Sequence, residues 1–199
     1  MIDMVYAGLL VAAAYLIGSI PSGLLLARAR GIDIRDFGSG NIGATNVSRA
    51  LGKKLGAVVL VLDALKGASP VAAVLLLGYD HNVDPFVITA TGAAAISGHC
   101  FSIFLGFYGG KGVATSLGVF CVLSPPAALI ATAVFAAMYA AFRVASIGSV
   151  TGAVSMTPSL LLLGASDAVV TLGIAATLLI VVTHRGNIHR LLHGQERKV

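Results

Sequence analysis

Long apolar segments are the feature of this chain that most restricts its fold. Hydrophobic residues make up 57% of the 199 residues and charged residues only 11%, whereas soluble domains carry about 25% charged residues. The apolar residues gather in seven segments, at 4–27, 55–77, 85–104, 113–123, 127–142, 147–163 and 168–183. Because a helix needs about 20 apolar residues to cross a bilayer, we expect an all-α integral membrane protein, a polytopic bundle of about seven transmembrane helices in a single domain, 1–199.

Two of these segments need comment. The first has no basic residue before it and Arg28, Arg30 and Arg35 after it, the reverse of a secretory signal, so we interpret it as a retained transmembrane helix. The fourth and fifth segments are short and are separated only by Ser124-Pro125-Pro126. They form either two crossings or a re-entrant hairpin, and both ends of the pair stay on one side in either case.

The basic residues predict the orientation of the chain. Connections around 80–84, 124–126 and 164–167 contain no Lys or Arg. The other side carries Arg28, Arg30, Arg35, Arg49, Lys53, Lys54, Lys111, Arg143, Arg185, Arg190, Arg197 and Lys198. Since positive residues concentrate on the cytoplasmic side, we expect the N-terminus outside and the C-terminus in the cytoplasm.

Three glycine-rich polar stretches interrupt the apolar sequence on that cytoplasmic side, at 38–46, 109–112 and 184–190. Glycines let backbone N–H groups crowd around an anion, and the neighbouring Arg, Lys, His, Ser and Asn side chains supply charge and donors. These stretches therefore predict a shared phosphate-binding site at the membrane surface.

The first stretch contains Gly38, Gly40 and Gly43 in a G-x-G-x-x-G pattern. No strand precedes it, so the dinucleotide interpretation fails. Further donors and possible helix caps come from Ser39, Asn41, Thr45 and Asn46. A tight loop that needs positive φ angles explains the glycines equally well.

The second stretch adds a lysine, and the third adds a histidine beside Arg185. Lys111 lies between Gly110 and Gly112, and Gly112 stands where a P-loop would need Ser or Thr for magnesium. A mobile lysine for a phosphate and a snorkelling lysine both remain possible. In the third stretch His184 and Asn187 directly follow the last apolar segment.

The residues after His184 have a helical pattern of their own. Ile188, Leu191 and Leu192 have the spacing of an interfacial amphipathic helix. A basic membrane anchor is the alternative interpretation of this tail. It explains Arg190 and Arg197 but not Gly186-Asn187 beside His184.

Asp63 and Lys66 are charged residues inside the second apolar segment. Each alone would cost about 2.5 to 3.5 kcal/mol to insert, and their i, i+3 spacing lets them pair on one helical face. The pair either bridges helices, which we favour, or lines a polar cleft.

Several familiar chemistries are excluded by the residues present. His99 is followed five residues later by Phe104, so the His-x4-Asp acyltransferase signature is absent, and no Gly-x-Ser-x-Gly elbow occurs. The only cysteines, Cys100 and Cys121, show no metal or redox spacing. They would lie toward opposite faces of the bilayer, which argues against a disulfide.

Taken together, Gly38-Ser-Gly-Asn-Ile-Gly-Ala-Thr-Asn46, Gly109-Gly-Lys-Gly-Val-Ala-Thr115 and Gly186-Asn-Ile-His-Arg-Leu-Leu-His-Gly-Gln-Glu196 resemble the three motifs of the bacterial acyl-phosphate:glycerol-3-phosphate acyltransferase family, PlsY. The resemblance extends to Gly18-Ser-Ile-Pro-Ser22, Asp63-Ala-Leu-Lys66 and Ser146-Ile-Gly-Ser149. It implies transfer of a fatty acyl group from acyl phosphate to the 1-hydroxyl of glycerol 3-phosphate, giving lysophosphatidate and phosphate, the first acylation of bacterial phospholipid synthesis.

The resemblance also implies the site. Its catalytic residues would be Ser39, Arg49, Lys111, His184 and Asn187, and its substrate-binding residues Gly38, Gly40, Asn41, Gly43, Thr45, Asn46, Gly110, Gly112 and Ser149. The loop from Ser39 to Thr45 would hold the donor phosphate, and Arg49, Lys111, His184 and Asn187 the glycerol phosphate. Either His184 or a substrate phosphate would be the general base.

The same resemblance sets the expected surroundings of the enzyme. We expect the bacterial cytoplasmic (inner) membrane, an active site that faces the cytoplasm, contact with membrane lipid, function as a monomer, and no cofactor, metal or nucleic-acid partner. An organic-phosphate transporter and a lipid-binding scaffold are the rival functions. The first would usually show repeated halves, and the second does not explain three polar motifs.

Overall fold

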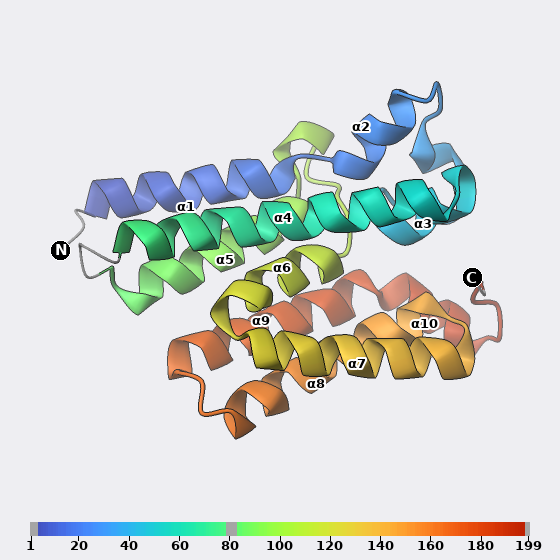
Figure 1. Cartoon of the computed structure of the whole chain (residues 1–199). Helices are drawn as coiled ribbons and strands as arrows, with labels where there is room; N and C mark the ends of the chain where they lie inside the picture. Colours follow the sequence, from blue (N-terminus) through green and yellow to red (C-terminus); the bar gives the residue numbers. More distant parts are fainter. Residues whose placement is uncertain (1–3, 79–82, 198–199) are drawn as a thin grey trace. The chain divides into compact units, whose positions relative to one another are not determined.

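The computed structural model describes residues 4–78 and 83–197, and every regular element in these ranges is helical (Figure 1). This confirms the all-α prediction. Asp80 and Lys198, which entered the orientation argument, lie outside the described residues. The chain divides into two compact units, Met1–Val119 and Phe120–Val199, and each is described by itself. The single domain stays a prediction.

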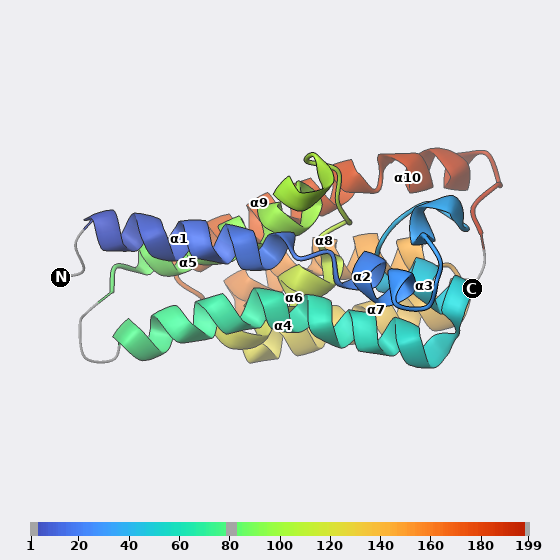
Figure 2. The same cartoon turned by 90° about the horizontal axis from the view of Figure 1, so that it is seen from above.

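The first unit is built on three long helices that run side by side (Figures 1 and 2), with shorter elements near the start of α4. Its elements are α1 (Met4–Ser19), α2 (Ser22–Arg28), η1 (Ile34–Asp36), α3 (Ala44–Leu51), α4 (Lys53–Gly78), α5 (Pro85–Cys100), η2 (Ile103–Leu105) and the first part of α6 (Val113–Leu123). The apolar segments of the sequence coincide with α1 and α2 together, α4, α5 and α6.

Close backbone contact joins α1 to α5. A Cβ atom at Gly18 would overlap the carbonyl oxygen of Ala95, and one at Gly98 would overlap that of Tyr15. Only glycine lets the helices approach this closely, which is the usual way in which helices associate in lipid. Tyr15 Oη also donates to the carbonyl oxygen of Phe101 (2.6 Å), so α1 is tied to the loop that follows α5.

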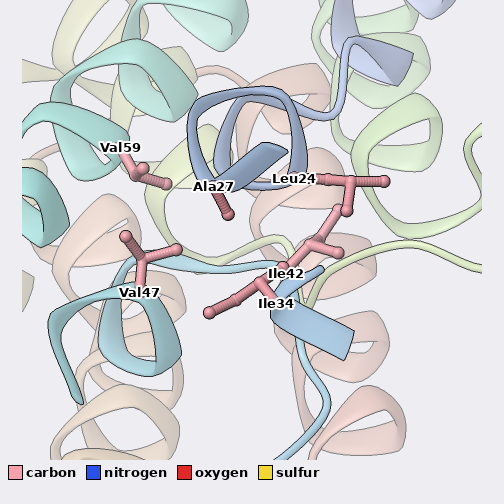
Figure 3. Packing of buried hydrophobic residues seen from close by; sticks show 6 residues of the cluster. All are labelled: Leu24, Ala27, Ile34, Ile42, Val47 and Val59. Carbon is pink, nitrogen blue, oxygen red and sulfur yellow. The ribbon is translucent and has the colours of Figure 1, made fainter. Parts of the chain in front are cut away.

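An apolar cluster anchors the first polar connection to α4. Six buried side chains from α2, η1, the following loop, α3 and α4 meet there (Figure 3): Leu24, Ala27, Ile34, Ile42, Val47 and Val59. Each is at most 6% exposed. Burial of a Leu, Ile or Val side chain contributes roughly 1.5 to 3 kcal/mol. The cluster therefore holds both ends of the polar loop between η1 and α3 in place.

The first apolar segment is broken, which the sequence analysis did not predict. α1 ends at Ser19 and α2 begins at Ser22, because Pro21 lacks the N–H that would continue the helix. The carbonyl oxygen of Ser19 accepts from Ser102 Oγ (2.6 Å), and that of Ile20 accepts from Lys66 Nζ (2.8 Å). Side chains from elsewhere in the unit thus satisfy the backbone at the break.

Asp63 and Lys66 form the predicted ion pair, with Nζ 2.9 Å from Oδ1. Their side chains are only 4% and 6% exposed. Nδ1 of His99, from α5, lies 3.7 Å from the same Asp63 oxygen. Since Lys66 also reaches Ile20, the pair bridges α4 to the break in the first apolar segment.

The second unit contains the end of α6 and four further helices: α7 (Pro125–Phe142), α8 (Ala145–Leu162), α9 (Asp167–Thr183) and α10 (Arg185–Leu192). α8 packs against both α7 and α9. α9 and α10 meet at a bend of 56°. The amphipathic helix predicted from Ile188, Leu191 and Leu192 is therefore present as α10.

The number of crossings is only partly established. In the described part of the chain, five helices are long and apolar enough to span a membrane, or six if α9 and α10 count as one bent span. α6 is shorter, with 11 residues, so the count of seven stays a prediction. Cys100 and Cys121 are both free thiols, as expected.

Replacing Lys66 by Met should lower the free energy of unfolding by about 3–5 kcal/mol, because the Asp63 carboxylate would stay buried without its partner. The double variant Asp63→Asn/Lys66→Met should lose less than the sum of the two single changes. Denaturant unfolding in detergent micelles measures both, with Lys53→Met, at an exposed lysine of the same helix, as control. Additive single effects would contradict the coupling.

Candidate phosphate-binding site

The first polar stretch forms a turn between η1 and α3. Gly38 and Gly40 have φ angles of 56° and 69°, a conformation that favours glycine. Oδ1 of Asn41 accepts from the N–H of Gly43 (2.9 Å), and Gly43 is the N-cap residue of α3. The positive-φ interpretation of these glycines is therefore correct for two of them, and it is compatible with anion binding.

Asn46 fixes this turn through three hydrogen bonds. Its Oδ1 accepts from the N–H of Ser39 (3.0 Å), and its Nδ2 donates to the carbonyl oxygens of Ile34 (3.1 Å) and Phe37 (2.9 Å). The residue is 2% exposed. We therefore interpret Asn46 as a residue that positions Ser39, a role that sequence reasoning did not assign to it.

Three residues of this stretch are exposed: Gly38, Ser39 and Thr45. Thr45 lies in the first turn of α3, where backbone N–H groups have no partner within the helix and the helix dipole favours an anion. Arg49 is half-buried in the last turn of the same helix. The turn and α3 thus place predicted site residues on one continuous segment.

Two other arginines of this connection are engaged by Asp33. Its carboxylate accepts from Arg35 Nε (2.9 Å) and Nη2 (2.6 Å), and from Arg28 Nη2 at 3.4 Å. The hydrogen bonds from Arg35 hold the pKa of Asp33 well below its usual value. No sequence pattern indicated that Asp33 pairs with Arg28 and Arg35.

The second polar stretch, 109–112, forms the end of the loop between α5 and α6. The N–H of Gly110 donates to the carbonyl oxygen of His99 (2.9 Å). Gly112 has a φ of 81°, and its carbonyl oxygen accepts from the N–H of Ser116 (2.8 Å), in the first turn of α6. Lys111 lies between them and is half-buried.

In the second unit, His184 occupies the bend between α9 and α10 and is 2% exposed. Its Nδ1 lies 2.8 Å from the carbonyl oxygen of Ile180. A carbonyl oxygen only accepts, so this bond assigns the proton to Nδ1. In a neutral ring Nε2 is then the nitrogen able to bind a proton.

Glu196 is a site-supporting residue that the sequence analysis quoted in a motif without giving it a role. Its carboxylate accepts from Asn187 Nδ2, Arg190 Nε (2.7 Å) and Ser146 Oγ (3.0 Å). Burial raises the pKa of Glu196, but these hydrogen bonds outweigh it, and the net shift is downward. As the only acidic residue after position 167, Glu196 could have been noticed.

Glu196 thereby links α10 to α8, the helix that carries Ser149. Ser149 is half-buried and lies one turn after Ser146. His184 and Asn187, at the start of α10, are one turn apart and both buried. Within this unit the predicted site residues therefore sit at the ends of two helices joined by one carboxylate.

The class of protein follows from these features. Apolar helices of membrane-spanning length carry glycine turns with Lys, Arg, His and Asn, a donor set suited to phosphate groups. In the described ranges, no group of three or more His, Cys, Asp or Glu residues could hold a metal ion. The molecule is a multi-pass membrane protein with a candidate phosphate-binding site.

Comparison with known proteins gives the family. A family model described as Glycerol-3-phosphate acyltransferase matches residues 8–194. The Glycerol-3-phosphate acyltransferase of Anaeromyxobacter dehalogenans is 51% identical over 195 residues, which are 96% of each chain. The chain belongs to the glycerol-3-phosphate acyltransferase family.

Two solved structures of PlsY (YgiH), an integral membrane glycerol 3-phosphate acyltransferase, are similar to this chain. The glycerol 3-phosphate form matches with a TM-score of 0.91 and 44% identity, covering 97% of this chain and 95% of that one. The lysophosphatidic acid form matches with a TM-score of 0.89 and 43% identity, covering 96% and 94%. The family identified from the three motifs is confirmed.

Glu196→Gln should lower the free energy of unfolding at pH 7 by about 1–3 kcal/mol, because charge-assisted hydrogen bonds are lost. The folded pKa of Glu196 is depressed, so its stabilisation is complete above the ordinary Glu pKa of about 4.3 and is lost as the pH falls below that value. The stability difference between the two proteins should therefore shrink below about pH 4.

Thermal unfolding of both proteins at pH 7 and at about pH 3, with Gln195→Ala at the exposed neighbouring position as control, measures this effect. A difference that is independent of pH would contradict the role of the Glu196 charge.

Proposed function

We propose that this chain transfers a fatty acyl group from acyl phosphate to the 1-hydroxyl of glycerol 3-phosphate, producing lysophosphatidate and inorganic phosphate. The reaction is the first acylation of bacterial phospholipid synthesis. The observation that carries the proposal is the similarity over nearly the whole chain to structures in a glycerol 3-phosphate form and a lysophosphatidic acid form. The two forms correspond to an acceptor and a product of this reaction.

This reaction requires the protein mainly to orient the two substrates and to stabilise negative charge. Acyl phosphate is an activated mixed anhydride: the acceptor hydroxyl attacks its carbonyl carbon, the hydroxyl proton leaves, and the bond between that carbon and the phosphate oxygen breaks. No covalent acyl-enzyme is needed. The protein holds the hydroxyl against the carbonyl carbon and stabilises charge on the carbonyl oxygen and the departing phosphate.

We assign the residues accordingly. The turn from Ser39 to Thr45, with its glycines and Asn41, binds the donor phosphate. Arg49 and Lys111 bind the glycerol phosphate, and so do His184 and Asn187. With one proton on Nδ1 of His184, Nε2 would accept the hydroxyl proton in the base role, whereas in the ligand role it would carry a second proton and donate to the phosphate. We favour the ligand role, with a substrate phosphate accepting the hydroxyl proton.

We further propose a location in the bacterial cytoplasmic (inner) membrane. α6 counts as a seventh crossing, the N-terminus lies outside, and the C-terminus and active site face the cytoplasm. The concentration of Arg and Lys in alternate connections supports this orientation. We also propose a single domain, 1–199, and a monomer, with acyl phosphate drawn from the surrounding lipid and no cofactor or metal.

Purified protein incubated with acyl phosphate and labelled glycerol 3-phosphate should form labelled lysophosphatidate, and a chelator of divalent cations should leave the rate unchanged. Acyl-CoA should fail to replace acyl phosphate. Binding of glycerol 3-phosphate without acylation would favour a transporter or a lipid-binding scaffold. Loss of turnover with chelator, restored by magnesium, would overturn the metal-free mechanism.

Arg49→Ala and Lys111→Ala should each reduce kcat/KM by at least about thirtyfold, since losing one partner of a desolvated charge pair costs roughly 2 to 5 kcal/mol. Two phosphate groups brought together repel each other unless cations lie around them. Steady-state kinetics on protein of native thermal stability measures the effect.

Arg30→Ala is the matched control, because Arg30 is exposed in the same connection and has no assigned role. It should retain activity within about threefold, as exposed substitutions away from a site usually do. Near-normal kinetics in folded Arg49→Ala or Lys111→Ala would contradict the two-phosphate site.

A further inference from the structure

His99 is a buried residue that the proposed reaction does not use, yet it contacts the second polar stretch. It lies in the last turn of α5 and is 4% exposed. Its carbonyl oxygen accepts from the N–H of Gly110 (2.9 Å). Its ring lies against the same glycine: a Cβ atom at Gly110 would overlap Nε2 and come within 2.9 Å of both Cδ2 and Cε1.

The neighbouring glycine is restricted by something different. At Gly110 the three atoms nearest to an added Cβ all belong to the ring of His99. At Gly109 they are backbone atoms, the carbonyl oxygens of His99 and Cys100 and the carbonyl carbon of Cys100. The side chain of His99 therefore dictates glycine at position 110, whereas the backbone dictates it at 109.

The ring of His99 is itself held by the buried charges of α4. Its Nδ1 lies 3.7 Å from Asp63 Oδ1 and has no hydrogen-bond partner among the residues that the structure describes. Asp63 is fixed by Lys66 at 2.9 Å, and Lys66 is fixed by the carbonyl oxygen of Ile20 at 2.8 Å. This series of contacts runs from the break in the first apolar segment to the ring that faces Gly110.

We propose that His99 is a positioning residue, which together with Asp63 and Lys66 fixes the loop 109–112 and so sets the place of Lys111. A loop with glycine at three of four positions has many accessible conformations and loses much entropy when it is ordered. The His99 ring on one side of Gly110 removes part of that freedom before substrate binds. This inference rests on the proposed role of Lys111 in binding the phosphate of glycerol 3-phosphate.

A pair of variants separates this role from general packing. Gly110→Ala should raise the KM for glycerol 3-phosphate at least about tenfold, because misplacing a binding group by about 1 Å has effects of this size or greater. The KM for acyl phosphate should change little. In the background His99→Asn, whose amide keeps a polar group beside Asp63 but lacks the Nε2 atom that an added Cβ would overlap, Gly110→Ala should raise that KM less than about threefold.

Two controls accompany the pair. His99→Gln, whose amide nitrogen reaches the position of Nε2, should not rescue Gly110→Ala. Gly109→Ala should not be rescued by His99→Asn, since its obstacle is backbone. Where Gly110→Ala gives too little folded protein for kinetics, the same rescue should appear in the yield of folded protein and in its thermal midpoint.

The outcomes distinguish this inference from the proposed function. Loss of activity in Lys111→Ala, together with equal effects of Gly110→Ala in the wild-type and His99→Asn backgrounds, would overturn the role of His99 and leave the function intact. Normal kinetics in Lys111→Ala would overturn the proposed site itself. Rescue at position 110 but not at 109 is the result that the geometry predicts.

Discussion

Satisfying backbone polar groups without water is the constraint on which this structure depends. An apolar bundle offers no solvent partner for a carbonyl group freed where a helix breaks, and each unsatisfied group costs several kcal/mol in lipid. At the break after Ser19 the partners are Ser102 and Lys66. At the turn before α3 they come from Asn46. At both of these places the departure from helix is thus fixed by specific buried side chains.

The same arrangement suits the proposed chemistry. A site that stabilises two phosphates and a developing oxyanion works best when its donors are already in place, because they then need no reorganisation during the reaction. Asn46 orders the N–H of Ser39, Glu196 orders Asn187, and the backbone of His99 orders Gly110. Asn46, Glu196 and His99 therefore support residues to which we assign substrate binding.

The sequence predicted those features that depend on residues close to one another along the chain. Hydropathy placed α6 at Val113–Leu123 as the structure has it, and i, i+3 spacing gave the Asp63–Lys66 pair. The break at Pro21, by contrast, is completed by residues 46 and 83 positions away, which no local pattern reveals. The roles of Asn46 and Glu196 were missed for the same reason: a motif shows which residues occur together, but not which of them hold the others.

Binding of glycerol 3-phosphate to the purified protein in lipid nanodiscs, followed by isothermal titration calorimetry without any acyl donor, tests the central claim most directly. The account predicts saturable binding of one molecule per chain, weakened at least about thirtyfold by Lys111→Ala, as expected for a lost charge partner. Absence of saturable binding, or equal affinity in the wild-type and Lys111→Ala proteins, would contradict it.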